Sequence, residues 1–150
     1  KDKVDLIIVS MHWGEEYVTT PNNSQKQIAK ELSDMGVNLV IGNHAHMIEP
    51  VEKINNTLVF YALGNFIAAQ DTNDKQTGAL VTLNINKDKN GKITFSNVKA
   101  NLLYTYFKGS HNFKVYPYTK LNNSILNNYE TYYNKYKGVL TKYTNIVEVE

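Results

Sequence analysis

Three histidines stand where their side chains could share one site. His44 and His46 are separated by one residue and follow an apolar run that ends at Gly42. Side chains at i and i+2 on extended backbone point to the same side, so both rings are expected to face one site. His12 follows an earlier apolar run in the same way. Imidazole nitrogen binds Zn, Mn and Fe, and the three histidines therefore predict a metal site whose ion the sequence does not specify.

The residues around these histidines indicate a strand, a helix and a second strand. The run 4–10 is apolar and β-branched, which is typical of a strand buried on both faces of a parallel sheet. Residues 24–35 have apolar side chains at helical spacing, and Ser24 and Gln27 suggest a capping box. The run 37–41 is the second strand. Parallel strands of such a unit end at the same sheet edge, where ligands bind, so the histidines are expected to converge there.

The rest of the chain indicates mainly strands. Turn signals at Asn55-Asn56 and Asn90-Gly91 predict two hairpins. The tyrosine-rich stripe 121–136 has helical spacing and is more typical of a packing face than of a ligand site. Residues 68–77 are expected to form a loop. The strands are expected over 51–54, 57–63, 79–85, 93–106 and 115–118.

Several polar residues near the histidines have both a chemical and a structural interpretation. Glu16 is a candidate catalytic acid together with His12, or a carboxylate that orients a metal ligand. Asn43 and Asn65 are candidates for binding a substrate oxygen, although Asn also serves in turns. Trp13 either forms a wall of the site and contacts substrate or covers the core. His111 is expected in a surface loop.

Composition narrows the chemistry. The 150 residues are enough for one domain with a buried core. The chain has no Cys, which excludes thiolate metal ligands and disulfides. Its net charge of +2 is small, which argues against nucleic acid as a partner. The chain begins with Lys1, close to its first predicted strand, and we expect it to be part of a longer protein.

Three ordered motifs resemble one known family. They are His12-Trp13-Gly14-x-Glu16-Tyr17, Gly36-x-x-Leu39-Val40-Ile41-Gly42-x-His44-x-His46-x-x-x-Pro50 and Tyr61-x-Leu63-Gly64-Asn65-Phe66. With Pro21 and Gln25 or Gln27 between the first two, they resemble the bacterial capsule-synthesis proteins of the CapA type. That family includes the accessory protein of poly-γ-glutamate synthesis and belongs to the calcineurin-like metallophosphatase superfamily. The resemblance covers residues 4 to about 85.

The resemblance implies an α/β fold, namely the carboxyl-terminal half of a four-layer α/β/β/α metallophosphatase-like sandwich. Residues 1–110 would form that half-domain, and residues 111–150 a tyrosine-rich helical extension packed on it. His12, His44 and His46 would hold divalent Mn, Zn or Fe in a site that is dinuclear in the intact domain. The remaining ligands would lie in the missing amino-terminal half, so this fragment alone would hold metal weakly or not at all.

The resemblance also implies a role in capsule or poly-γ-glutamate biosynthesis, with possible metal-dependent hydrolysis or transfer at a phosphate or amide. The implied partners are the missing half of the domain and an anionic polymer or the membrane subunits of capsule synthesis. The implied location is the extracellular face of the cell membrane, with the anchor outside this sequence. Two alternatives stay open: a non-catalytic scaffold or polymer-handling subunit, and a mononuclear hydrolase that uses the three histidines alone.

Overall fold

A computed structural model describes residues 4–109 and 111–150 of the chain, which form two β-sheets and two α-helices. The fold is mixed α/β, as predicted. In chain order the elements are β1 (Ile8–His12), α1 (Asn23–Asp34), β2 (Leu39–Asn43), β3 (Val51–Ile54), β4 (Thr57–Phe60), β5 (Thr77–Lys87), β6 (Ile93–Lys108), β7 (His111–Pro117), the 3-10 helix η1 (Tyr118–Lys120), α2 (Tyr129–Leu140) and β8 (Val147–Val149).

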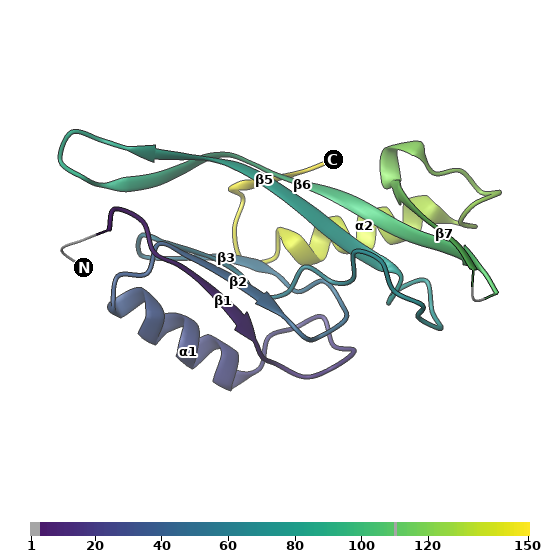
Figure 1. Cartoon of the computed structure of the whole chain (residues 1–150), viewed down its shortest axis with the longest axis horizontal. Helices are drawn as coiled ribbons and strands as arrows, with labels where there is room; N and C mark the ends of the chain where they lie inside the picture. The colour runs from purple at the N-terminus through teal and green to yellow at the C-terminus, as the bar shows by residue number, and fades with distance from the viewer. Residues whose placement is uncertain (1–3, 110) are drawn as a thin grey trace.

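The first sheet has the strand order β1-β2-β4-β3 (Figure 1). Strands β1 and β4 run parallel to β2, and β3 pairs antiparallel with β4. The predicted βαβ unit and first hairpin are thus confirmed. The prediction that the first strand is buried on both faces was wrong. Strand β1 lies at the end of the strand order and alternates between exposed and half-buried residues, with Ile8 48% exposed.

Helix α1 forms as predicted, but its amino-terminal cap differs. Asn22 is the N-cap, and its side chain accepts a hydrogen bond from the Gln25 amide while the Gln25 side chain accepts one from the Asn22 amide. The capping box therefore lies two residues earlier than the predicted pair of Ser24 and Gln27. The helix ends at Asp34, and Gly36 just beyond it has a φ of +80°, which suits the left-handed turn after a helix C-terminus.

The second sheet is built on the long hairpin of β5 and β6, which extends past the first sheet (Figure 1). Strand β7 pairs antiparallel with β6, and β8 pairs parallel with it. The second predicted hairpin and the strand near 115–118 are confirmed. Helix α2 also forms, but it begins at Tyr129 rather than at 121 and continues through Gly138.

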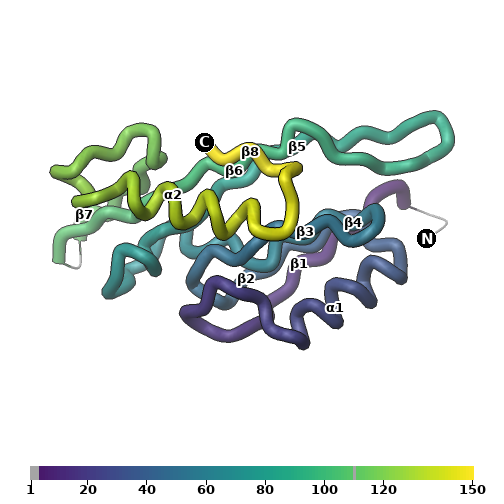
Figure 2. Tube along the Cα trace, turned by 180° about the vertical axis from the view of Figure 1, so that it is seen from behind, coloured from purple at the N-terminus to yellow at the C-terminus, as the bar shows by residue number. Residues whose placement is uncertain are grey.

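Two hydrophobic clusters hold these elements together. One lies between α1 and the first sheet and includes Trp13, Ala29 and Val40. The larger one joins side chains of the first sheet, the second sheet, α2 and β8, and includes Phe60, Leu102 and Leu140. The first sheet is therefore covered by α1 on one side and packs against the second sheet on the other. Helix α2 lies beside both sheets (Figure 2). The four-layer sandwich and the division at residue 110 stay predictions.

None of the helices within residues 4–109 and 111–150 combines the length and apolar character that crossing a membrane requires.

Candidate functional site

The carboxyl ends of β1 and β2 bring two of the three predicted histidines together. His12, the last residue of β1, is paired in register with Asn43, the last residue of β2. His44 follows directly, and its ring centroid lies 4.5 Å from that of His12. This contact is what the parallel strand order predicts. The two imidazoles, one exposed and one half-buried, form the center of the candidate site.

The loop that carries His44 and His46 is not extended. The backbone φ is +106° at His44 and +55° at His46, so the alternation rule for extended backbone does not apply to them. The premise of extended backbone was therefore wrong, and a shared site for both rings stays a prediction. Left-handed backbone at a residue other than glycine costs of order 1–3 kcal/mol, and such strain concentrates at functional sites. Two neighbouring strained histidines support a functional role for this loop.

Asn65 fixes the orientation of the His46 ring. Its side-chain nitrogen donates to the Lys75 carbonyl oxygen at 2.7 Å, which leaves its Oδ1 facing His46 Nδ1 at 3.0 Å. An amide oxygen accepts only, so Nδ1 carries the proton in the neutral ring and Nε2 keeps its lone pair. A hydrogen bond of this kind is how proteins orient histidines that bind metals. The amide of Asn65, predicted to bind substrate, is engaged in holding His46.

Tyr17 covers His46, and Lys75 in turn lies over Tyr17. The Tyr17 ring stacks on the His46 ring at a centroid distance of 5.8 Å, and the Tyr17 amide donates to the Ala45 carbonyl at 2.7 Å. The Lys75 ammonium lies 4.0 Å from the centroid of the Tyr17 ring. The Asp71 carboxylate hydrogen-bonds this ammonium and raises the pKa of Lys75 above its ordinary value. No sequence pattern pointed to Lys75 as part of the site, because it lies in a polar loop that is distant in sequence from the histidines.

Glu16 lies beside His46 rather than beside His12. Its Oε1 is 3.8 Å from His46 Nε2, and both side chains are partly exposed. The carboxylate therefore faces the nitrogen that carries the lone pair. Asn43 is exposed, and its backbone carbonyl accepts a hydrogen bond from the Trp13 amide at 3.1 Å. A role of its side chain in binding substrate stays a prediction.

Trp13 belongs to the core. It is 7% exposed, its indole N–H donates to the Tyr61 carbonyl at 2.8 Å, and its ring stacks on that of Tyr61. Of the two roles considered for Trp13, the structure therefore supports packing over contact with substrate. Gly42 serves the same arrangement. A Cβ there would lie 2.0 Å from the Tyr61 oxygen and 2.3 Å from the Trp13 indole nitrogen, so glycine is needed for close packing and not for a turn.

The described residues do not form a complete metal site. In residues 4–109 and 111–150, no group of three or more His, Asp or Glu side chains is arranged to hold an ion. A site formed by His12, His44 and His46 alone thus has no preformed counterpart here. His111 lies on β7 in the second sheet and is exposed, so its predicted surface position is confirmed although it lies in a strand.

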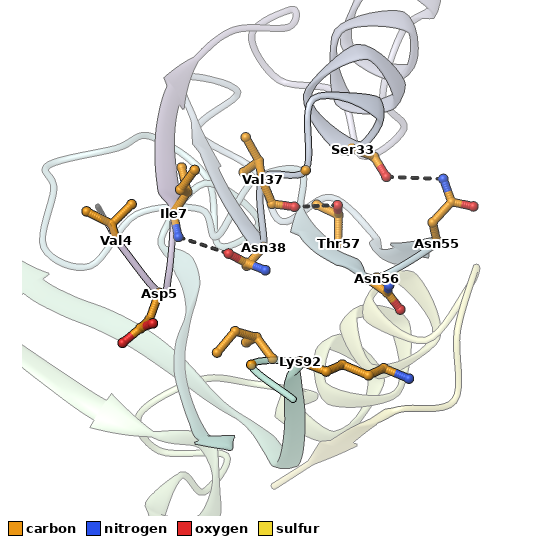
Figure 3. Close-up of a pocket in the computed structure, with 13 residues that line it drawn as sticks. Val4, Asp5, Ile7, Ser33, Val37, Asn38, Asn55, Asn56, Thr57 and Lys92 are labelled. Atoms are coloured by element: carbon orange, nitrogen blue, oxygen red, sulfur yellow. Dashed lines mark hydrogen bonds between the residues drawn. The ribbon is translucent and has the colours of Figure 1, made fainter. Parts of the chain in front are cut away.

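A cavity of about 310 Å³ lies at the opposite edge of the first sheet, where the strands begin (Figure 3). Its polar groups are largely paired with each other. Asn38 accepts from the Ile7 amide at 2.9 Å, and the Thr57 hydroxyl donates to the Val37 carbonyl at 2.6 Å. These bonds tie the strand starts together, and they indicate a structural role for this edge. The histidine edge is the better functional candidate.

The fold and the site define an α/β protein with a histidine cluster at the carboxyl edge of a mainly parallel sheet. Residues 1–70 match the family described as bacterial capsule synthesis protein PGA_cap. This segment includes His12, His44, His46 and Asn65. Over these residues the chain is similar to the CapA-type capsule synthesis proteins.

Individual relatives agree with this family match. The chain is 39% identical over 92 residues to the PGA biosynthesis protein CapA of Bacillus subtilis (strain 168), which is 61% of this chain and 24% of that protein. It is 36% identical over 81 residues to the capsule biosynthesis protein CapA of Bacillus anthracis, covering 54% and 20%. It is 34% identical over 65 residues to a probable polyglutamine synthesis accessory protein of Mycobacterium tuberculosis (strain CDC 1551 / Oshkosh), covering 42% and 17%. The matches thus span about a quarter or less of these relatives.

Proposed function

We propose that the histidine edge binds a divalent transition metal, Mn, Zn or Fe, and that the protein uses it in capsule or poly-γ-glutamate biosynthesis. The observation that carries the proposal is the contact between His12 and His44 beside an oriented His46. Rings held this way present nitrogen lone pairs at one edge of the sheet. The family match over residues 1–70 supports the biological process, and the donor chemistry supports the metal.

The residues at the edge fit part of a metal site. His12 and His44 would hold one ion, and His46 would join them or hold a second ion through Nε2. Further ligands would come from another part of the protein, which we take to be the amino-terminal half of a metallophosphatase-like domain. When bound, such ions polarise a phosphate or amide oxygen toward attack. Glu16 would take or give a proton beside His46 Nε2, which its carboxylate faces.

The names of the relatives suggest the setting of this activity. Two are named for capsule or PGA biosynthesis, and one as a probable polyglutamine synthesis accessory protein. We extend this setting to the present chain and propose that its protein meets an anionic polymer or the membrane subunits that make or export it. The proposed location is the extracellular face of the cell membrane.

A second candidate function is a scaffold that handles the polymer without catalysis. It is favoured by the absence of a three-ligand group in the described residues and by the engagement of the Asn65 amide with backbone and His46. A scaffold would keep the histidine edge for packing or for a structural ion. The two functions differ in whether hydrolysis accompanies metal binding.

Calorimetric titration of the full-length protein with Zn²⁺ or Mn²⁺ tests whether the histidine edge binds metal. His44→Ala is expected to weaken binding at least tenfold because it removes a ligand next to His12. His111→Ala is the matched control, since it removes an exposed histidine of the second sheet, and its affinity should be unchanged. Equal affinity in His44→Ala and the unsubstituted protein would contradict the proposal. Phosphodiesterase activity that depends on metal and on His44 then supports the enzyme, and metal binding without activity supports the scaffold.

A further inference from the structure

Glu49 is a carboxyl group enclosed by the protein beneath the histidines. Its exposed fraction is 0%, and its Oε2 accepts a hydrogen bond of 2.7 Å from the Gln25 side-chain nitrogen. Its Oε1 is buried and has no hydrogen-bond partner among the described residues. Buried polar atoms are nearly always paired, so an unpaired carboxyl oxygen calls for a physical reason. The sequence carries a sign of it, because Glu49 stands alone among the apolar residues of 47–51.

The hydrogen bond joins three segments of the site. Glu49 ends the loop that follows β2, and its amide donates to the Ala62 carbonyl at 3.0 Å. Gln25 is fully buried in the first turn of α1 and belongs to the capping box there. Gly14, in the loop after His12, lies against Gln25 so closely that a Cβ would be 2.7 Å from its amide nitrogen. The Gln25–Glu49 bond is therefore where α1 and both histidine-bearing loops meet.

Among residues 4–109 and 111–150, no positive charge acts on the Glu49 carboxyl group. Gln25 is the polar group that faces it from α1, and Tyr61 is the titratable group near it from the segment after β4. The Tyr61 hydroxyl donates to Glu52 on β3 at 2.7 Å, which leaves that phenol neutral and directed away. Burial raises the pKa of Glu49 to about 7, and the hydrogen bond from Gln25 opposes the rise in part.

We propose that Glu49 is a positioning residue for the histidine loop, residues 43–47, and that Gln25 and a proton on Glu49 together hold this loop in place. With the proton, the carboxyl group is neutral and the enclosed arrangement is tolerated. Without it, a buried charge has one donor and one unpaired oxygen, which favours arrangements in which Oε1 reaches water. The histidine loop, which precedes Glu49 in the chain, moves with this carboxyl group. The importance of this proton-dependent positioning rests on the proposed function of the histidine edge. The positioning itself does not depend on that function.

NMR of the metal-free protein tests the proposal directly. Carboxyl carbon signals report the protonation of Glu49, and amide signals of the Gln25 side chain, Tyr17 and Ala45 report the position of the loop. These signals are expected to shift with one common midpoint near neutral pH. In Glu49→Gln this midpoint should vanish. Glu52→Gln, which changes the carboxylate bonded to Tyr61, is the matched control and should keep the midpoint.

A second variant checks the direction of the effect. Gln25→Met removes the donor that stabilises the charged carboxylate, so the midpoint of Glu49 should move to higher pH. A Glu49 midpoint close to 4.5, or loop signals that titrate identically in Glu49→Gln, would overturn the proposal. Failure of the protein to bind metal would leave these results unchanged, because the readout is the loop in the absence of metal. The two proposals therefore fail separately.

Discussion

The chemistry of His46 is set by one amide side chain. Asn65 uses both ends of its amide, because its nitrogen donates to the Lys75 carbonyl and its oxygen faces His46 Nδ1. Reversing the amide would place a donor and a carbonyl oxygen in the wrong positions, so the bond to Lys75 fixes the tautomer of His46. Asn is abundant in this chain, and the sequence alone did not separate this Asn from those in turns.

Asn65→Ala should release the His46 ring and cost stability. The nitrogen-15 shifts of the ring are expected to change from a predominantly Nδ1-protonated form to a mixture dominated by the Nε2-protonated form, which prevails in an unconstrained histidine side chain. The Lys75 carbonyl loses its donor, and unfolding in urea should show a loss of about 1–2 kcal/mol. Asn43→Ala is the control, since that side chain is exposed and should leave both measurements unchanged. An unaltered tautomer in Asn65→Ala would show that Asn65 does not orient His46.

At the scale of elements, patterns of many residues predicted which strands and hairpins form, whereas the helix cap and the backbone of the histidine loop differed from prediction. The βαβ unit and both hairpins depend on many residues acting together, so a single exception does not change them. The position of the capping box and the direction of the His46 side chain each depend on backbone dihedrals at one residue. Sequence spacing carries little information about these, because Asn22 and Ser24 are both good caps. The edge position of β1 depends on strand order, which local sequence does not encode.

Substitutions at the start of α1 distinguish the observed cap from the predicted one. Asn22→Ala removes the acceptor for the Gln25 amide and should destabilise the protein by about 1 kcal/mol. Ser24→Ala lies inside the first turn, where its hydroxyl is not the cap, and should change stability by less than about 0.5 kcal/mol. Thermal unfolding followed by circular dichroism measures both. A larger loss for Ser24→Ala than for Asn22→Ala would restore the capping box predicted from the sequence.

At the scale of the whole molecule, the histidine edge depends on both sheets. Gly78 at the start of β5 approaches Asn65 so closely that a Cβ would lie 2.0 Å from its carbonyl oxygen. The loop that carries Lys75 is also bound to α2, because Tyr136 and Lys135 both contact the Asp74 carboxylate at 2.6 Å. The tyrosine-rich helix was predicted to be a packing face, and its buried Tyr136 confirms this. The packing of the second sheet and α2 therefore helps to fix the orientation of His46, because these elements contact Asn65 or the loop to which Asn65 is bonded.

Glu49 makes the stability of the whole molecule depend on pH. Its carboxyl group ionises near 4.5 in the unfolded chain and near 7 in the folded one, so the folded state holds a proton that the unfolded state has lost between these values. Stability from this group is fully present below about pH 4.5, decreases as the pH rises to about 7, and is constant above. A shift of this size corresponds to about 3 kcal/mol as an upper value.

Urea unfolding of the protein and of Glu49→Gln at pH 5 and pH 8 measures this contribution by difference, which cancels the groups that both proteins share. The variant should gain stability relative to the unsubstituted protein by about 2.5 kcal/mol between the two pH values, because it has no charge to bury and part of the effect is already lost at pH 5. Glu52→Gln should show no such gain, since the Glu52 carboxylate accepts from Tyr61 and shows partial exposure. A difference between the protein and Glu49→Gln that is the same at both pH values would mean that Glu49 is ionised in the fold at pH 5, and its unpaired oxygen would then have to be explained by a donor that moves toward it.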